Sequence, residues 1–394
     1  MSCHIRHIPA VITHASLYYF SVKVLTYLLY SFLRYEMDNT EKLLKALTEA
    51  PGPSGYEQGI RKVVRQYLNE CGEVSYDKIG SIICHKAGTR TAPKVMIAAH
   101  MDEIGFMVKL ITKDGFIHFT GLGGWPSQVL PAQLVEVHTN KGIVKGVIAS
   151  KPPHLMTAEE RKKLVEAKDL IIDIGATTDE EVKATGIRVG DPIVPVGSFN
   201  ILNVKEKTYM AKAMDNRVGV GLAIATMQSI KGNPNSLYAA MTVQEEVGCR
   251  GAKTSVEMIQ PDVAIVLDVD IAGDIPGIKP SESSLKMGGG PSIMAYDART
   301  IPNTALRDLV IDTADELRIP VQLSAMEGGA NDGSMIHLSR IGVPTIAIGV
   351  ATRHIHSHNS IIRRSDFDNS LKLITAVIKK LNKKTVDSLT DFSK

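Results

Sequence analysis

The sequence predicts an α/β protein with a mainly parallel sheet and a small β-rich domain inserted into it. From residue 37 onward, apolar strand-like segments alternate with amphipathic segments. This alternation is typical of parallel sheets whose strands are joined by helices. Between residues 103 and 197 it stops, and short strand signals separated by turn residues replace it. We therefore expect a larger domain made of residues 37–102 and 203–394, with an inserted β-rich domain at residues 103–202.

The elements of the larger domain follow from hydrophobic periodicity and from turn residues. Helices are predicted at 57–72, 218–230, 303–319 and 365–381, and strands at 80–88, 94–111, 236–246, 263–270 and 343–350. The run 95–99 is continuously apolar, as expected for a strand buried on both faces. In the insert we expect strands at 133–139, 141–149 and 191–197, and one short charged helix at 157–167.

Composition and charge argue against some classes of function and against a disulfide-rich secreted protein. The chain has 394 residues, 44% hydrophobic and 22% charged, with a net charge of +3. Because no basic stripe is interleaved with aromatic residues, nucleic acid is not a favoured partner. The four cysteines form no C-x-x-C pair, which fits a reducing cytoplasm better than a disulfide framework.

Residues 1–36 form an N-terminal extension with a different character. Residues 10–33 are mostly apolar and nearly long enough to span a bilayer, which takes roughly 20 residues. Lys23 in the middle of this stretch makes membrane insertion costly, so membrane contact is not favoured. We expect the extension to be disordered or not translated, with translation starting at Met37. A membrane anchor is the alternative.

Ionisable side chains recur where the predicted strands end or a helix begins. They are His100, Asp102, Asp215, Glu245, Glu246, Asp268 and His356. In open α/β sheets, ligand sites lie at the carboxyl ends of the strands, so these residues can meet although they are far apart in the sequence.

Two readings of these residues stay open from the pattern alone. Histidines and carboxylates without thiols suit zinc, cobalt or manganese, and the number of donors is sufficient for two ions. One carboxylate would then stay off the metals and act as general base. Alternatively, Asp215 is a helix N-cap, His356 a solvated loop residue, and Asp268 the partner of a lysine.

The adjacent pair Glu245 and Glu246 poses a geometric problem. Neighbouring side chains on a strand point to opposite faces. Both carboxylates can reach one site only if the strand ends at Gln244 or Glu245 and the chain then turns toward Gly248. We predict that turn.

Several segments resemble the tetrahedral (TET) aminopeptidases. This family comprises glutamyl and deblocking aminopeptidases, some of which are named endoglucanases. The resemblance covers residues 37–381 and rests on "AAHMDEIGFMV", "AMDNRVGVG", "TVQEEVGCRGA", "VLDVD" and "TRHIHSH", with "ASKPPHL" and "DIGATTDEEV" in the insert. It implies a co-catalytic metallopeptidase domain with two divalent ions per subunit, a PDZ-like insert that mediates dimerisation, and a homododecamer built from dimers.

The resemblance also implies a role for each residue. His100 and Asp268 would bind one metal ion, Glu246 and His356 the other, and Asp215 would bridge the two ions. Glu245 would be the general base. Asp102 would orient His100 or the adjacent metal site without binding metal itself.

Two other functions remain as alternatives. A glycosidase would use two carboxylates without metal and would commonly stack sugars on aromatic residues, whereas this chain has one tryptophan, Trp125. A chelator distinguishes this glycosidase from a metallopeptidase, because only the metallopeptidase loses its activity when metal is removed. A peptide-binding scaffold would use the insert, but a scaffold is expected to have lost some of the ligand set, which here is complete.

Overall fold

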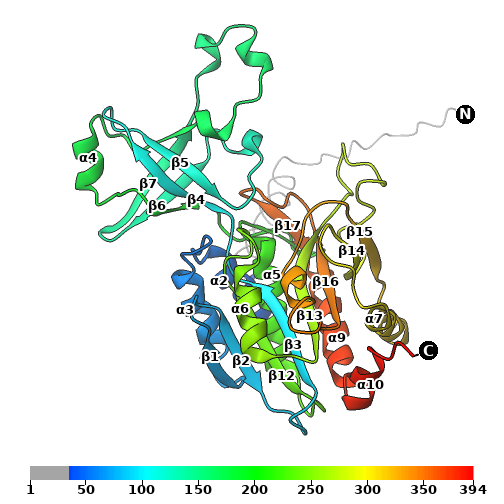
Figure 1. The fold of residues 1–394 in the computed structure, drawn as a ribbon. Coiled ribbons are helices and arrows are strands. Elements are labelled where there is room, and N and C mark those ends of the chain that lie inside the picture. Colours follow the sequence, from blue (N-terminus) through cyan, green and yellow to red (C-terminus); the bar gives the residue numbers. More distant parts are fainter. Residues whose placement is uncertain (1–34, 394) are drawn as a thin grey trace, which may run out of the picture. The chain divides into compact units, whose positions relative to one another are not determined.

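The computed structural model describes residues 35–393 (Figure 1). Residues 43–394 form one compact unit, which contains the sheets and the candidate site. The stretch 10–33 lies outside the described residues, so the interpretations of the extension stay predictions. Within the described part of the chain, no helix combines the length and the apolar character needed to cross a membrane.

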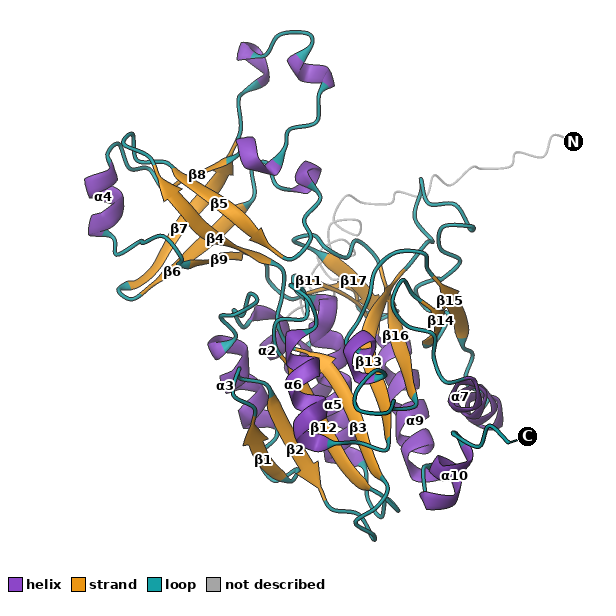
Figure 2. Cartoon of the chain, viewed as in Figure 1, coloured by secondary structure: helices purple, strands orange, loops and turns teal. Residues whose placement is uncertain are grey.

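The largest element of the described chain is an eight-stranded sheet (Figure 2). Its strands lie in the order β1-β2-β12-β3-β13-β16-β14-β15. Their bounds are β1 (Glu73–Tyr76), β2 (Ile82–Lys86), β3 (Lys94–His100), β12 (Ser236–Thr242), β13 (Val263–Ile271), β14 (Ser292–Tyr296), β15 (Gln322–Ala325) and β16 (Thr345–Thr352). The four central strands β12, β3, β13 and β16 are parallel, whereas β1, β2 and β14 also form antiparallel pairs. The predicted α/β fold is confirmed, with a mixed sheet whose centre is parallel.

Helices cover both faces of this sheet (Figure 1). The described helices are α2 (Asn39–Glu49), α3 (Gln58–Tyr67), α4 (Asp179–Ala184), α5 (Met214–Ser229), α6 (Arg250–Ile259), α7 (Thr304–Glu316), α8 (Gly333–Ile336), α9 (Arg364–Lys380) and α10 (Lys383–Ser388). On one face α6 and α8 pack against β3, β12 and β13, and their apolar side chains share a core with alternate strand residues such as Met96, Ala98 and Val266. On the other face α5 contacts β3 and β13. The central strands are therefore buried on both faces, as the apolar run 95–99 predicts.

A closed six-stranded barrel occupies the segment between β3 and the second half of the chain. Its strands, in the order β4-β5-β8-β7-β6-β9, are β4 (Gly105–Ile111), β5 (Ile117–Leu122), β6 (Leu134–Thr139), β7 (Gly142–Ala149), β8 (Ile171–Asp173) and β9 (Pro192–Pro195). Phe106, Phe119, Val137 and Ile172 are among the side chains that fill its interior. These strands lie within residues 103–202, where the sequence predicts an inserted domain. That this segment mediates dimerisation stays a prediction.

The helix predicted at 157–167 is wrong. The segment contains the 3-10 turn η3 (Glu160–Lys162) and the first residue of a second, η4 (Ala167–Asp169). Two further 3-10 turns precede it, η1 (Ser127–Val129) and η2 (Pro153–Leu155). No residue of η3 is buried. A short helix gains most of its stability from packing an apolar face, whereas in this segment only Val165 and Ala167 pack against the barrel core and Leu164 is 70% exposed.

A small antiparallel sheet, β10 (Asn200–Asn203), β11 (Thr208–Ala211) and β17 (Ser360–Arg363), lies next to the main sheet. Ala211 at the end of β11 pairs with Ser360 at the start of β17. This pairing brings the beginning of α5 close to the loop between β16 and β17. Asp215 and His356 lie in those two segments.

Candidate metal centre

The predicted site residues come from five neighbouring segments, four of them at the carboxyl ends of parallel strands. His100 is the last residue of β3, and Asp268 lies in β13 three residues before its end. Glu245 and Glu246 occupy the turn between β12 and α6. Asp215 begins α5, and His356 lies in the β16–β17 loop. The structure brings all of these residues, and Asp102, to one region.

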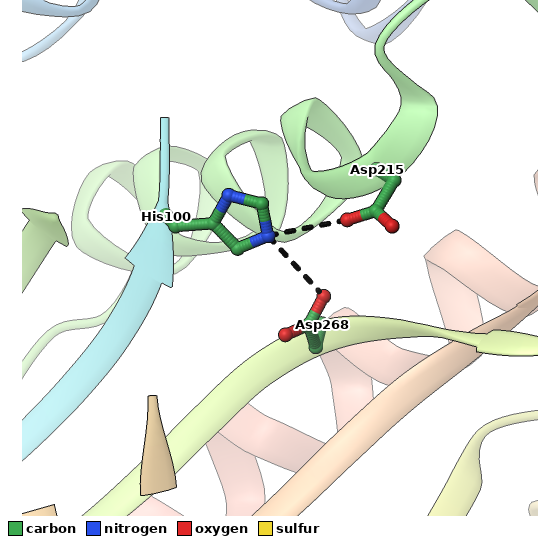
Figure 3. Close-up of side chains that lie close together, drawn as sticks. All are labelled: His100, Asp215 and Asp268. Carbon is green, nitrogen blue, oxygen red and sulfur yellow. Dashed lines mark hydrogen bonds and ion pairs between the residues drawn. The ribbon is translucent and has the colours of Figure 1, made fainter. Parts of the chain in front are cut away.

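His100 faces three carboxylates, two of which, those of Asp215 and Asp268, are drawn in Figure 3. Its Nε2 lies 3.1 Å from Asp215 Oδ1, 3.9 Å from Asp268 Oδ1 and 3.8 Å from Glu245 Oε2. His100 is 2% exposed and Asp268 8% exposed. His100, Asp215 and Asp268 each offer one ligand atom within 4.8 Å of the others, which makes them a candidate metal-binding group.

A second group shares Asp215 with the first. The Nε2 of His356 lies 3.5 Å from Asp215 Oδ2 and 3.8 Å from Glu246 Oε2. Asp215 therefore turns one carboxylate oxygen toward each histidine. A carboxylate in this position can bridge two cations.

The other ring nitrogen of each histidine contacts a fixed oxygen. His356 Nδ1 lies 2.6 Å from the backbone carbonyl oxygen of Gly124. His100 Nδ1 lies 3.2 Å from the Asp102 carbonyl oxygen and 3.4 Å from Asp102 Oδ1. When Nδ1 carries the proton and donates it to these oxygens, Nε2 is left as the acceptor that a metal needs.

Asp102 also fixes the glutamate pair. Its carboxylate accepts hydrogen bonds from the backbone N–H groups of Glu245, at 3.0 Å, and Glu246, at 3.2 Å. The Ser54 hydroxyl donates to the same carboxylate at 2.6 Å. Asp102 itself is fully buried. One side chain thereby holds both a candidate ligand and the turn that carries the two glutamates.

The strand before the pair ends earlier than predicted. β12 stops at Thr242, not at Gln244 or Glu245, and the backbone of Gln244 is left-handed, with φ of 57°. Gly248 and Cys249 donate backbone hydrogen bonds to the Glu245 carbonyl oxygen, which closes the turn. Both carboxylates consequently reach the same region, Glu245 near His100 and Glu246 near His356.

The structural alternatives for the ligands find little support. The backbone of α5 is non-helical at Asp215 and Asn216, and Asn216 Oδ1, not the Asp215 carboxylate, accepts the hydrogen bond of the Gly219 N–H, so Asp215 does not cap that helix. Within the described part of the chain Asp268 has no lysine partner, and its Oδ1 accepts a hydrogen bond from the Val269 N–H. His356 is held by Gly124 and is not a freely solvated loop residue.

Several buried carboxylates at the site would be stabilised in their charged form by a nearby positive charge. Burial raises the pKa of Glu245 and of Glu246 to about 8, and burial also raises the pKa of Asp268 well above its usual value. Burial would likewise raise the pKa of Asp215, but the hydrogen bonds to His100 and His356 hold it low. Glu246 Oε1 is buried without any hydrogen-bond partner in the described chain. Divalent cations would neutralise these carboxylates, and the unpartnered Glu246 oxygen could bind one of them. The donor set therefore fits a metal site.

A cavity of about 560 Å³ is lined by the candidate ligands His100, Asp215, Glu246, Asp268 and His356. Apolar side chains, among them Met294, Met326 and Ile355, line the cavity together with Arg299 and Asn331. A substrate that enters this cavity can therefore reach the candidate ligands.

Sequence reasoning missed the groups that support the ligands. The Gly124 carbonyl belongs to a segment 232 residues from His356, and a backbone oxygen leaves no signal in the sequence. Below the site, Glu103 forms buried ion pairs with Lys212, at 2.6 Å, and Arg217, at 3.5 Å. The charges of Glu103, Lys212 and Arg217 could have indicated these ion pairs, because charged residues in otherwise apolar surroundings need partners.

This architecture and this donor set place the chain in the class of α/β metallohydrolases. The M42 glutamyl aminopeptidase family matches residues 80–373, and a family described as AMPT matches residues 38–64. The chain belongs to the M42 aminopeptidase family. It is accordingly a divalent-metal-dependent peptide hydrolase, and the resemblance to TET aminopeptidases is confirmed.

Three relatives illustrate how far the similarity extends. The putative aminopeptidase FrvX of Escherichia coli is 37% identical over 353 residues, which are 89% of this chain and 98% of that protein. A TET aminopeptidase from Thaumarchaeota archaeon SCGC AB-539-E09 has 46% identity and a TM-score of 0.87, covering 90% of this chain and 99% of that one. The Pyrococcus horikoshii TET1 peptidase, which can assemble into a tetrahedron or a large octahedral shell, has 32% identity and a TM-score of 0.78, covering 86% and 99%.

Proposed function

We propose that the protein is an aminopeptidase that removes N-terminal residues from peptides with the help of two divalent cations. The observation that carries this proposal is the position of Asp215 between two histidines, with one oxygen toward each. His100 and Asp268 would hold one ion, His356 and Glu246 the other, and Asp215 both. Zinc and cobalt suit these ligands best, and manganese is compatible with them.

When bound, two such ions supply Lewis-acid polarisation of the scissile carbonyl and lower the pKa of a water molecule. Glu245 accepts the proton of the attacking water at Oε2, the oxygen that lies 3.8 Å from His100 Nε2. The same carboxyl then donates the proton to the leaving amine. The Asp102 carboxylate accepts a hydrogen bond from the backbone N–H of Glu245, which keeps Glu245 in place, and it also holds the ring of His100.

A chelator tests the metal requirement and separates this function from the glycosidase alternative. We expect a strong chelator to abolish hydrolysis of aminoacyl-p-nitroanilides, and zinc or cobalt to restore it. A two-carboxylate glycosidase would be indifferent to the chelator. Cleavage of a β-glucan that survives complete metal removal would contradict the proposal.

We also propose that the protein forms a homo-oligomer, a dodecamer built from dimers, through the barrel segment. Large apolar side chains are exposed there, including Leu134, Ile143, Leu155 and Leu164, each at least 57% exposed. Apolar side chains exposed in this number favour burial against another subunit. Light scattering should give a mass near twelve chains, and Leu155→Glu combined with Leu164→Glu should lower it. A monomer at micromolar concentration would contradict this assembly.

The proposed location is the cytoplasm. The described cysteines Cys71, Cys84 and Cys249 are free and buried, which fits a reducing compartment. Cell fractionation with an antibody against the native protein tests this, and recovery in the membrane or secreted fraction would contradict it.

A further inference from the structure

A third group of potential metal ligands contains Glu245 and is separate from the two groups described above. Glu245, Cys249 and Asp332 each offer one ligand atom, and these atoms lie within 4.8 Å of one another. Cys249 directly precedes α6 and Asp332 directly precedes α8, so both are held by the ends of packed helices. Cys249 Sγ lies 3.1 Å from Glu245 Oε1, the oxygen other than the one that faces His100.

Asp332, a member of this group, has a buried carboxylate oxygen without a hydrogen-bond partner in the described part of the chain. The residue is 1% exposed, and its Oδ2 accepts a hydrogen bond from the Thr242 hydroxyl. Its Oδ1 is buried and has no hydrogen-bond partner among the described residues. A buried carboxylate oxygen without a partner is costly, because it has lost water and gained nothing in return. A cation bound between the three side chains would remove that cost.

A hydrogen bond from the thiol accounts for only part of this arrangement. The Cys249 thiol can donate its proton to Glu245 Oε1, which explains the short distance between them. That bond leaves Asp332 Oδ1 without a partner and two carboxylates close together. A divalent cation explains all three positions at once.

The group is accessible from the substrate cavity. Glu245, Cys249 and the neighbouring Asn331 all line the 560 Å³ cavity. An ion from solvent can therefore reach the thiol without unfolding of the sheet. Because the same cavity is lined by the candidate metal ligands, an ion bound here would lie beside the candidate metal centre.

We propose that Glu245, Cys249 and Asp332 form a third, inhibitory cation site that selects thiophilic ions such as zinc in excess or cadmium. The thiol releases its proton to solvent as the sulfur–metal bond forms, so one proton leaves for each ion bound. Thiolates favour such soft ions over magnesium or calcium. The inhibitory effect rests on the proposed function: a Glu245 carboxylate engaged by this ion no longer accepts the proton of water.

The kinetic test uses the full-length enzyme loaded with zinc and then titrated with additional zinc. The variant Cys249→Ser keeps a hydroxyl that can hydrogen-bond to Glu245 but removes the soft ligand. Cys84→Ser is the matched control, because Cys84 is equally buried but lies on β2, away from the cavity. Relative to each variant's own activity without excess zinc, we expect half-inhibition of Cys249→Ser to need at least tenfold more zinc than wild type. Cys84→Ser should behave as wild type.

Two binding measurements do not depend on turnover. Equilibrium dialysis with cadmium should show one more ion per subunit in the wild type than in Cys249→Ser, together with an ultraviolet thiolate-to-cadmium absorption band that Cys249→Ser lacks. Cadmium should also protect Cys249 of the wild-type enzyme from alkylation, as read by peptide mass spectrometry. This last measurement needs no variant and holds even if a variant fails to fold.

Equal zinc inhibition of wild type and Cys249→Ser would overturn the proposal, as would unchanged alkylation of Cys249 in cadmium. Magnesium should neither inhibit nor protect. If zinc-loaded enzyme hydrolyses no peptide substrate but cadmium still protects Cys249, the proposed function fails and the cation site stands. If hydrolysis is normal and neither ion acts through Cys249, the cation site fails and the function stands.

Discussion

Asp102 Oδ1 accepts a hydrogen bond of 3.0 Å from the backbone N–H of Glu245, although 143 residues separate the two in the chain. The same carboxylate oxygen lies 3.4 Å from His100 Nδ1. One buried side chain thus connects a candidate metal ligand to the candidate general base. Asp102 therefore fixes the relative position of ligand and base together with the backbone hydrogen bonds of the turn.

Asp102→Asn should therefore impair catalysis without touching any proposed ligand. An amide offers one acceptor oxygen where the carboxylate offers two, so at least one backbone N–H of the glutamate pair loses its partner. We expect kcat or metal affinity to fall about 10–100-fold, as for other residues that orient metal ligands. Ser54→Ala is the control, since Ser54 bonds to Asp102 but to neither His100 nor the pair. Equal effects of the two substitutions on kcat and on metal affinity would argue against the role given to Asp102.

Glu246→Ala should cost the enzyme one metal ion. Its Oε2 lies 3.8 Å from His356 Nε2, and the two residues share a candidate group with Asp215. Metal analysis of dialysed protein should give about one ion per subunit instead of two, with activity strongly reduced. Glu257→Ala, on α6, serves as a control for loss of a nearby glutamate that belongs to neither group. Full metal content in Glu246→Ala would refute its assignment as a ligand.

The close packing of α5 on β13 predicts different outcomes for two glycines on one helix. A Cβ on Gly219 would lie 2.4 Å from the Leu267 carbonyl oxygen, which is backbone and has little room to move. For a Cβ on Gly221 the nearest atoms would be side-chain carbons of Leu44 and Phe367, both 3.3 Å away. Gly219→Ala should push α5 away from β13, separate Asp215 from Asp268 and lower metal affinity and kcat at least tenfold. Gly221→Ala should keep both near wild type, and similar losses in the two variants would contradict this explanation.

The buried charges below the site predict a large change in stability. Glu103 is 1% exposed, and it neutralises Lys212 and Arg217, which are 4% and 0% exposed. Glu103→Gln leaves two buried cations without a counter-charge, so the free energy of unfolding should fall by about 3–5 kcal/mol. Glu160→Gln removes the partner of the exposed Lys151 and should change the urea midpoint very little. Comparable midpoints for the two variants would show that the buried ion pairs do not stabilise the fold.

The sequence predicts which ionisable residues converge because their positions follow from sheet topology. His100 and the glutamate pair follow parallel strands, and parallel strands end at the same edge. The supporting contacts follow from no such rule. Gly124 acts through its backbone, and Cys249 and Asp332 meet only because α6 and α8 pack on the same face of the sheet.

Local strand and helix limits were also harder to predict, for a physical reason. Val243 continues the apolar pattern of β12, but the hydrogen bonds of the following turn end the strand at Thr242. Segment 157–167 has helix-forming residues, but only Val165 and Ala167 pack against the barrel core and Leu164 is exposed, so 3-10 turns form there instead of a helix. In both cases tertiary contacts, or their absence, decide against local propensity.

The central claim is that Glu245 moves the proton while other residues hold the metals. Glu245→Gln, with metal content and kcat measured on the same preparation, tests it most directly. We predict two ions per subunit, as in the wild type, and a kcat lower by about 10²–10⁴-fold, the usual contribution of a general base. A Glu245→Gln enzyme that keeps both its metal and a near wild-type kcat would contradict the claim.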